Sequence, residues 1–141
     1  MNRFCFSFVI LLTLANAVKA EFDVVNLVTD DSAAHSALLT DSSLKNAWGI
    51  SYTPTGPFWL SANGSGISEV YQESALNPPA TPTKVGLTVT IPGDGSVTGQ
   101  VYNSTTGFNA DLFLFVSEDG TVSGWRGVNV NKSPALRAVV S

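Results

Sequence analysis

The sequence predicts an all-β fold built from antiparallel four-stranded units. Short apolar runs are separated by turn residues along the chain, which holds 12 glycines and 7 prolines among 141 residues. Short strands spaced in this way indicate an all-β domain. Within one run, Val85, Leu87, Val89 and Ile91 alternate with glycine and threonine, which is the pattern of a strand with one buried face.

A strand–turn–strand pattern also recurs along the chain. Ser61–Gly64 and Ser117–Gly120 lie 56 residues apart, and each is followed by a strand that ends in an aromatic residue. Four strands at a period of about 50 residues are typical of a β-propeller blade. We therefore expect residues 48–141 to form about two blades of an incomplete β-propeller. A small β-sandwich is the alternative fold.

The expected strands of this region cover residues 48–52, 58–61, 67–72, 85–91, 98–103, 112–117, 121–126 and 136–140. The dipeptides Asn63–Gly64 and Asp119–Gly120 are predicted to close two tight hairpins, because Asn, Asp and Gly accept the positive φ angles that such turns need.

The first 20 residues have the layout of a secretory signal peptide. Arg3 gives a basic start, residues 4–14 form an apolar run, and small residues offer cleavage after Ala17 or Ala20. The run is shorter than the ~20 residues that a membrane-spanning helix needs. We therefore expect a secreted protein, extracellular or periplasmic, that begins near Glu21 and has no membrane span after cleavage.

Residues 21–47 are expected to hold an N-terminal strand and a linker that lead into the propeller region. The apolar pattern predicts a strand over 22–28, and residues 31–46 are predicted to form a short helix or a pair of turns. The chain has one cysteine, Cys5, which lies in the leader. The mature chain is therefore expected to contain neither a disulfide nor a thiolate metal site.

The charge balance argues against nucleic acid as a partner. Lys and Arg number 7 against 11 Asp and Glu, for a net charge of −4, whereas nucleic-acid recognition needs a basic surface.

Candidate catalytic and metal-binding residues are few. The sequence has no Gly-x-Ser-x-Gly motif, and its one histidine, His35, is interpreted as exposed or capping. No cofactor is predicted, and Ca²⁺ is the one metal ion that the residue types leave open. The candidate oxygen ligands lie near the ends of expected strands, several of them at turn positions: Asn63, Asn103, Asp111, Glu118 and Asp119.

Aromatic residues recur in the expected strands. Trp48, Trp59 and Trp125 are predicted to fill the core between sheets, with carbohydrate stacking as the alternative role. Trp59 and Phe115 each lie on the second strand of a unit, and both are expected to be buried between the sheets.

Five blocks, in this order, resemble one protein family: residues 26–30, 44–50, 58–66, 98–103 and 118–125. The family comprises exported, uncharacterised proteins found mainly in bacteria, and it is also named after a giant-virus polyprotein-like protein. Its members resemble NHL-type β-propellers. The resemblance implies a propeller fold, and the usual length of the family implies that this chain is an N-terminal portion. It implies no catalytic residue, because the family has no established activity.

The sequence therefore favours an exported binding or scaffold module without catalysis. The alternative is a propeller hydrolase or lactonase that uses a divalent cation in its channel. The expected partners are an extracellular ligand or protein. Self-association is also expected, because two blades alone leave their outer faces open and expose alternating residues such as those of 85–91, or their counterparts.

Overall fold

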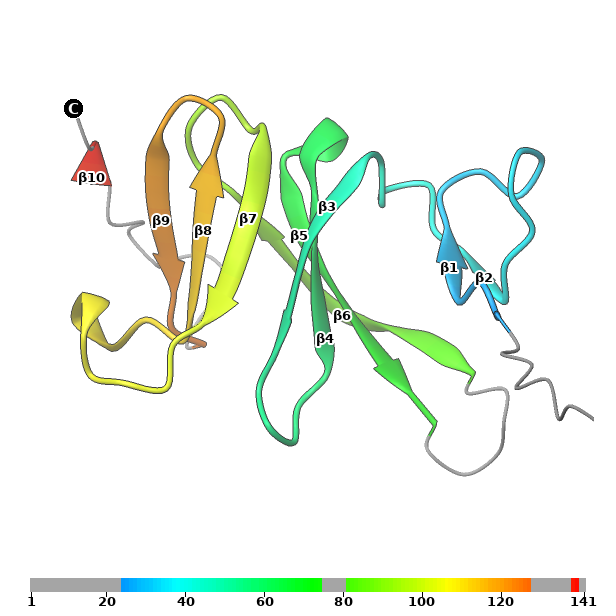
Figure 1. Cartoon of the computed structure of the whole chain (residues 1–141), viewed down its shortest axis with the longest axis horizontal. Coiled ribbons are helices and arrows are strands. Elements are labelled where there is room, and N and C mark those ends of the chain that lie inside the picture. Colours follow the sequence, from blue (N-terminus) through cyan, green and yellow to red (C-terminus); the bar gives the residue numbers. More distant parts are fainter. Residues whose placement is uncertain (1–23, 75–80, 128–137, 140–141) are drawn as a thin grey trace, which may run out of the picture.

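The computed structural model describes residues 24–74, 81–127 and 138–139, and these residues form an all-β fold (Figure 1). Two four-stranded antiparallel sheets lie side by side, and a two-stranded parallel sheet lies beyond the first of them. The described residues contain no α-helix. The all-β prediction is confirmed, and the assignment of the two sheets as propeller blades stays a prediction.

Both large sheets follow the order of the chain. The first sheet contains β3 (Ala47–Tyr52), β4 (Phe58–Ala62), β5 (Ile67–Glu73) and β6 (Pro82–Thr90). The second contains β7 (Val97–Tyr102), β8 (Phe113–Ser117), β9 (Thr121–Trp125) and β10 (Ala138–Val139). All eight strands predicted for residues 48–141 are therefore found, with shifted ends.

The N-terminal segment differs from its prediction. Its strands are β1 (Val28–Thr29) and β2 (Leu39–Thr40), which pair in parallel. Residues 22 and 23 lie outside the described part, and residues 24–27 belong to no strand, so the strand predicted over 22–28 is wrong there. A β-strand needs a neighbour of matching length, and β2 offers only two residues. Residues 32–34 form a turn, which was one of the two alternatives for this stretch.

The two predicted hairpin turns are present, but only one has the expected geometry. Gly120 adopts a φ of 79° after β8, as predicted. After β4, residues Asn63–Ser65 form a single 3₁₀ turn, η1, and the left-handed residue is Gly66, with a φ of 68°. Neither Asn63 nor Asp119 has a positive φ. A second 3₁₀ turn, η2 (Phe108–Ala110), lies between β7 and β8.

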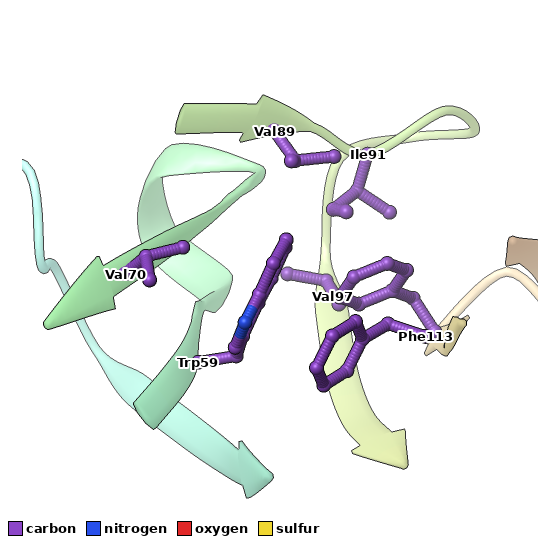
Figure 2. Close-up of a cluster of buried hydrophobic side chains, with 7 residues drawn as sticks. Trp59, Val70, Val89, Ile91, Val97 and Phe113 are labelled. Atoms are coloured by element: carbon purple, nitrogen blue, oxygen red, sulfur yellow. The ribbon is translucent and has the colours of Figure 1, made fainter. Parts of the chain in front are cut away.

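The main hydrophobic core lies between the two large sheets (Figure 2). Trp59 is 4% exposed and Phe115 is 1% exposed, so the predicted burial of both is confirmed. The Trp59 ring stacks on Phe113 with centroids 4.2 Å apart and lies 4.6 Å from the ring of Trp125. Aromatic pairs at these distances stabilise a core beyond their buried area.

The alternating face of the sixth strand also belongs to this core. Val89 and Ile91 are buried in it, and Val85 and Leu87 pack against it. The one-faced pattern is thus confirmed, and this face is covered rather than open. Trp48 is 59% exposed, so its predicted place in the core is wrong.

Candidate functional site

An open groove of about 770 Å³ lies where the N-terminal segment (residues 24–46) crosses the first sheet, on the face away from the main core. Its apolar lining comes from both sides: Val25, Leu27, Val28, Leu44, Ile50, Phe58, Leu60 and Tyr71. Its charged lining residues are two carboxylates, Asp30 and Glu73, and His35 also lines it. A mainly apolar hollow with a few polar groups is the usual form of a small-molecule site.

A small second core holds the N-terminal segment against this face. Leu44, Ala62 and Tyr71 are buried there, and Val28, Leu39, Leu60 and Ile67 pack around them. Period-2 alternation explains the split between the two cores: in β4, Trp59 points toward the second sheet, whereas Leu60 points toward the N-terminal segment.

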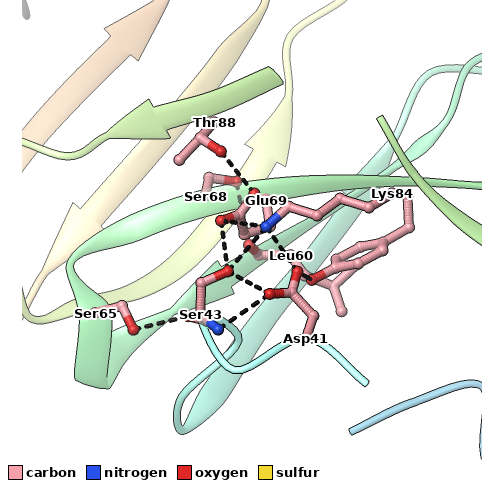
Figure 3. Close-up of polar contacts among 9 residues, drawn as sticks. Asp41, Ser43, Leu60, Ser65, Ser68, Glu69, Lys84 and Thr88 are labelled. Carbon is pink, nitrogen blue, oxygen red and sulfur yellow. Dashed lines mark hydrogen bonds and ion pairs between the residues drawn. The ribbon is translucent and has the colours of Figure 1, made fainter. Parts of the chain in front are cut away.

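A polar network lies on the same face, beside the second core (Figure 3). The register of β5 and β6 builds it, because Tyr71 pairs with Lys84 and Glu69 pairs with Thr88. The Lys84 Nζ lies 2.8 Å from Asp41 Oδ2 and 3.0 Å from Glu69 Oε1. One lysine thus bridges the N-terminal segment and the centre of the first sheet.

Hydroxyl groups complete the network. The Tyr71 hydroxyl donates to Asp41 Oδ2 at 2.7 Å, and Thr88 Oγ1 donates to Glu69 Oε2 at 2.9 Å. Ser43 Oγ lies 2.9 Å from Glu69 Oε1 and 2.5 Å from Asp41 Oδ1. These contacts matter because the Glu69 side chain is only 1% exposed, and a buried carboxylate is stable only when paired and hydrogen-bonded.

The network shifts the pKa values of three of its members. Burial would raise the pKa of Asp41, but hydrogen bonds from Lys84, Ser43 and Tyr71 hold it well below its usual range. Burial and the bond to Asp41 raise the pKa of Tyr71 far above that of a free tyrosine. Burial would lower the pKa of Lys84, but its bonds to Asp41 and Glu69 raise it.

These shifts decide what the network can do chemically. Lys84 Nζ lies 2.9 Å from Ser43 Oγ, which is the geometry of a serine nucleophile beside a lysine base. A lysine acts as a base only when its pKa is lowered toward neutrality. The raised pKa keeps Lys84 protonated, so the network fixes the chain around Asp41 to the sheet and does not activate Ser43.

Four of the five candidate calcium ligands fall into two separate pairs. Asn63 Nδ2 donates to Glu118 Oε1 at 2.9 Å, which joins the turns after β4 and β8. Asn103 Nδ2 donates to the backbone oxygen of Asp111 at 2.9 Å. Asp111 precedes β8 and Glu118 follows it, so the two pairs lie at opposite ends of that strand.

Their side chains also serve local structure. Asp119 Oδ1 accepts the backbone N–H of Thr121 at 2.8 Å. Asp111 Oδ1 pairs with Arg126 Nε at 2.7 Å, and its Oδ2 is buried against Gly124. Across the described ranges, no group of three or more His, Cys, Asp and Glu side chains is placed to hold a metal ion. His35 is exposed, as interpreted from the sequence, and it lies at the groove.

The groove and the polar network were not found from the sequence. Asp41, Glu69 and Lys84 are far apart in the chain. The β5–β6 register brings Glu69 and Lys84 together, and the packing of the N-terminal segment on the first sheet adds Asp41. The single local signal was Glu69, an acidic residue in the middle of the strand Ile67–Glu73, next to Val70.

Comparisons with known proteins add no relative. No family model, curated protein or solved structure matches this chain. Within the residues that the structure describes, no helix is long and apolar enough to cross a membrane.

Proposed function

We propose that the chain is an exported binding module whose groove takes a small amphipathic cation. The two large sheets are then neighbouring blades of a propeller-type fold, and the open faces of those sheets serve self-association. The observation that carries the proposal is the groove of about 770 Å³ between the N-terminal segment and the first sheet.

The groove supports one class of ligand in particular. Its apolar lining, with Phe58 and Ile50 among it, suits an aromatic or aliphatic body. The lining also contains two carboxylates, Asp30 and Glu73, and neither forms an ion pair among the described residues. A positively charged group on the ligand would complement them.

Binding rather than catalysis is the function that this geometry favours. The serine–lysine contact nearest to the groove is fixed in an ion-pair network, and its lysine carries a raised pKa. The divalent-cation hydrolase that the sequence left open gains no supporting observation, because the described candidate ligands are divided between the two ends of β8.

A matched pair of probes tests the proposal. Phenethylamine and 3-phenylpropionate share an aromatic body and differ in the sign of their charge, so we expect only the amine to raise the melting temperature of the protein. Glu73→Gln should weaken amine binding by roughly 1.4–5-fold, because an exposed charge pair contributes about 0.2–1 kcal/mol. Glu118→Gln, which removes a charge outside the groove, is the control. Equal binding of both probes, or of neither, would contradict the proposal.

A further inference from the structure

We propose that a second copy of the chain docks its strand β3 on the outer face of the second sheet. This inference rests on the self-association part of the proposed function. The outer face is the one that points away from the first sheet, and it is apolar, with Val101 54% exposed and Val116 43% exposed. The described residues of this face are Gly99, Val101, Leu114, Val116, Val122 and Gly124. Its exposed part is formed by β7 and by Val116, because Leu114 is 9% exposed and the Asp111 side chain lies over Gly124.

The contact between β3 and β7 within one chain is the template for this docking. At Gly49 on β3, an added Cβ would come within 2.7 Å of the Thr98 backbone oxygen and 3.1 Å of the Gln100 nitrogen. No real Cβ is tolerated so close to backbone atoms. Gly49 is therefore the residue that lets the two strands approach each other.

Gly99 occupies the same position in the second sheet. Tyr52 pairs with Phe58 in the first sheet and Tyr102 pairs with Phe113 in the second, and each glycine lies three residues before its tyrosine. A Cβ at Gly99 would meet no described atom within 4 Å. Its φ is not positive, so the register shift beside it does not require glycine. A glycine inside a strand often marks a close backbone approach.

The side chains around the internal contact are polar. Ser61 and Ser68, which are cross-strand partners on the first sheet, both donate to Gln100 Oε1 at 3.0 Å. The Gln100 amide nitrogen donates back to the Gly49 and Trp59 carbonyls. Beside the apolar core, β7 thus brings one glutamine to the first sheet, and this glutamine satisfies two buried serines.

The corresponding positions on the outer face are apolar throughout. Val116 and Val122 are cross-strand partners at the places that Ser61 and Ser68 take in the first sheet. On β3, the residue in the place of Gln100 is Ile50, which pairs with Leu60 as Gln100 pairs with Phe115. Within one chain, Gln100 contacts two serines. In the proposed docking, Ile50 of the second copy takes the place of this glutamine and meets the two valines instead.

The docking strand is exposed in the single chain. Trp48, Ile50 and Tyr52 alternate along β3 and are 59%, 61% and 58% exposed. The chain therefore carries both halves of the contact on different faces, which points to a second copy as the occupant. A contact between two different faces is head-to-tail, and it produces a ring or a filament.

The N-terminal segment limits the strength of this contact. Its Leu44 packs against Tyr71 of β5 and covers part of the first sheet, so a docking copy is left with β3 and its border. Interfaces of small area are typical of weak association. We therefore expect self-association that rises with protein concentration over the micromolar to millimolar range.

Sedimentation equilibrium of the exported full chain tests the inference. Gly99→Val adds a side chain where no described atom of the single chain lies within 4 Å, and it blocks the approach of a second copy, so its apparent dissociation constant should rise at least tenfold. Gly86→Val is the matched control, because Gly86 also lies in a strand with no described atom within 4 Å of its Cβ position. The control should associate like the wild type.

Mixing two variants tests the head-to-tail geometry. Gly99→Val keeps an intact β3, and Ile50→Asp keeps an intact outer face, so neither should associate alone. An equimolar mixture should form pairs that grow no further. Association that survives Gly99→Val would overturn the assignment of this face and leave the groove proposal standing. A wild type that remains monomeric would remove self-association altogether, and amine binding would test the groove separately.

Discussion

Replacing Lys84 by methionine removes the cation that contacts both Asp41 and Glu69 and keeps most of the apolar stem. Breaking a buried ion pair by removing one partner costs about 3–5 kcal/mol, and an exposed pair contributes about 0–1 kcal/mol. The Lys84 side chain is 35% exposed, and that of Glu69 is 1% exposed. The loss of unfolding free energy should lie between these limits, at roughly 2–3 kcal/mol at pH 7.

Urea unfolding followed by tryptophan fluorescence measures this loss, because Trp59 is buried in the main core and reports on its integrity. Lys45→Met is the matched control, since Lys45 is exposed and has no carboxylate partner among the described residues. It should change the unfolding free energy by less than about 0.5 kcal/mol. The reasoning is refuted if the two variants lose the same stability, or if Lys84→Met loses less than about 0.5 kcal/mol.

Gly49 at the contact between the two sheets and Asp41 in the polar network provide two further tests. Gly49→Ala should lower the unfolding free energy by roughly 1–3 kcal/mol, because the added Cβ would lie 2.7 Å from the Thr98 backbone oxygen. Gly99→Ala, where no described atom lies within 4 Å of the Cβ position, should be nearly neutral. Equal losses of the two variants in urea unfolding would contradict this prediction. The pKa of Asp41 is lower in the folded protein than in the unfolded chain, where it is about 4. The ionised carboxylate therefore stabilises the fold at pH values above about 4, and this contribution is lost as the pH falls toward the lowered folded pKa. The stability difference between wild type and Asp41→Asn should therefore shrink from pH 7 to pH 3, and a constant difference would count against the network.

The strands could be predicted because their signals are local. Alternation over 85–91 and the glycine of the Asp119–Gly120 turn act within a few residues, and both predictions are confirmed. The strand predicted over 22–28 was wrong over residues 24–27, because strand pairing depends on a partner elsewhere in the chain.

The faces of the strands were harder to predict. Aligning Ser61 with Ser117 places Trp59 opposite Phe115, and both are buried as expected. The strand pairings in the two sheets instead make Trp59 equivalent to Leu114, which is one residue before Phe115. A shift of one residue moves a side chain to the other face of a sheet. Trp59 and Phe115 therefore face each other across the core. An alignment of the two sequence repeats does not give the strand register, so it does not reveal which sheet faces remain open.

The candidate site depended on the same missing information. The groove exists because residues 24–46 lie on the first sheet, and no pattern in those residues specifies that sheet as their partner. The Lys84 bridge likewise needs the β5–β6 register, which includes an irregularity between Glu69 and Tyr71.

The strand order of the two sheets has a consequence for how the chain folds. In each sheet every strand pairs with its neighbour in the chain, and the turn over residues 118–120 shows how short the closing segments can be. Such local pairing forms early, because little chain entropy is lost before contacts are made. The late event is then the meeting of Trp59 with Phe113, which lie on separate sheets. Each sheet then forms before the two sheets pack together, so the contacts of the shared core are made late in folding. Mutations in this core should therefore change the folding rate less than the unfolding rate.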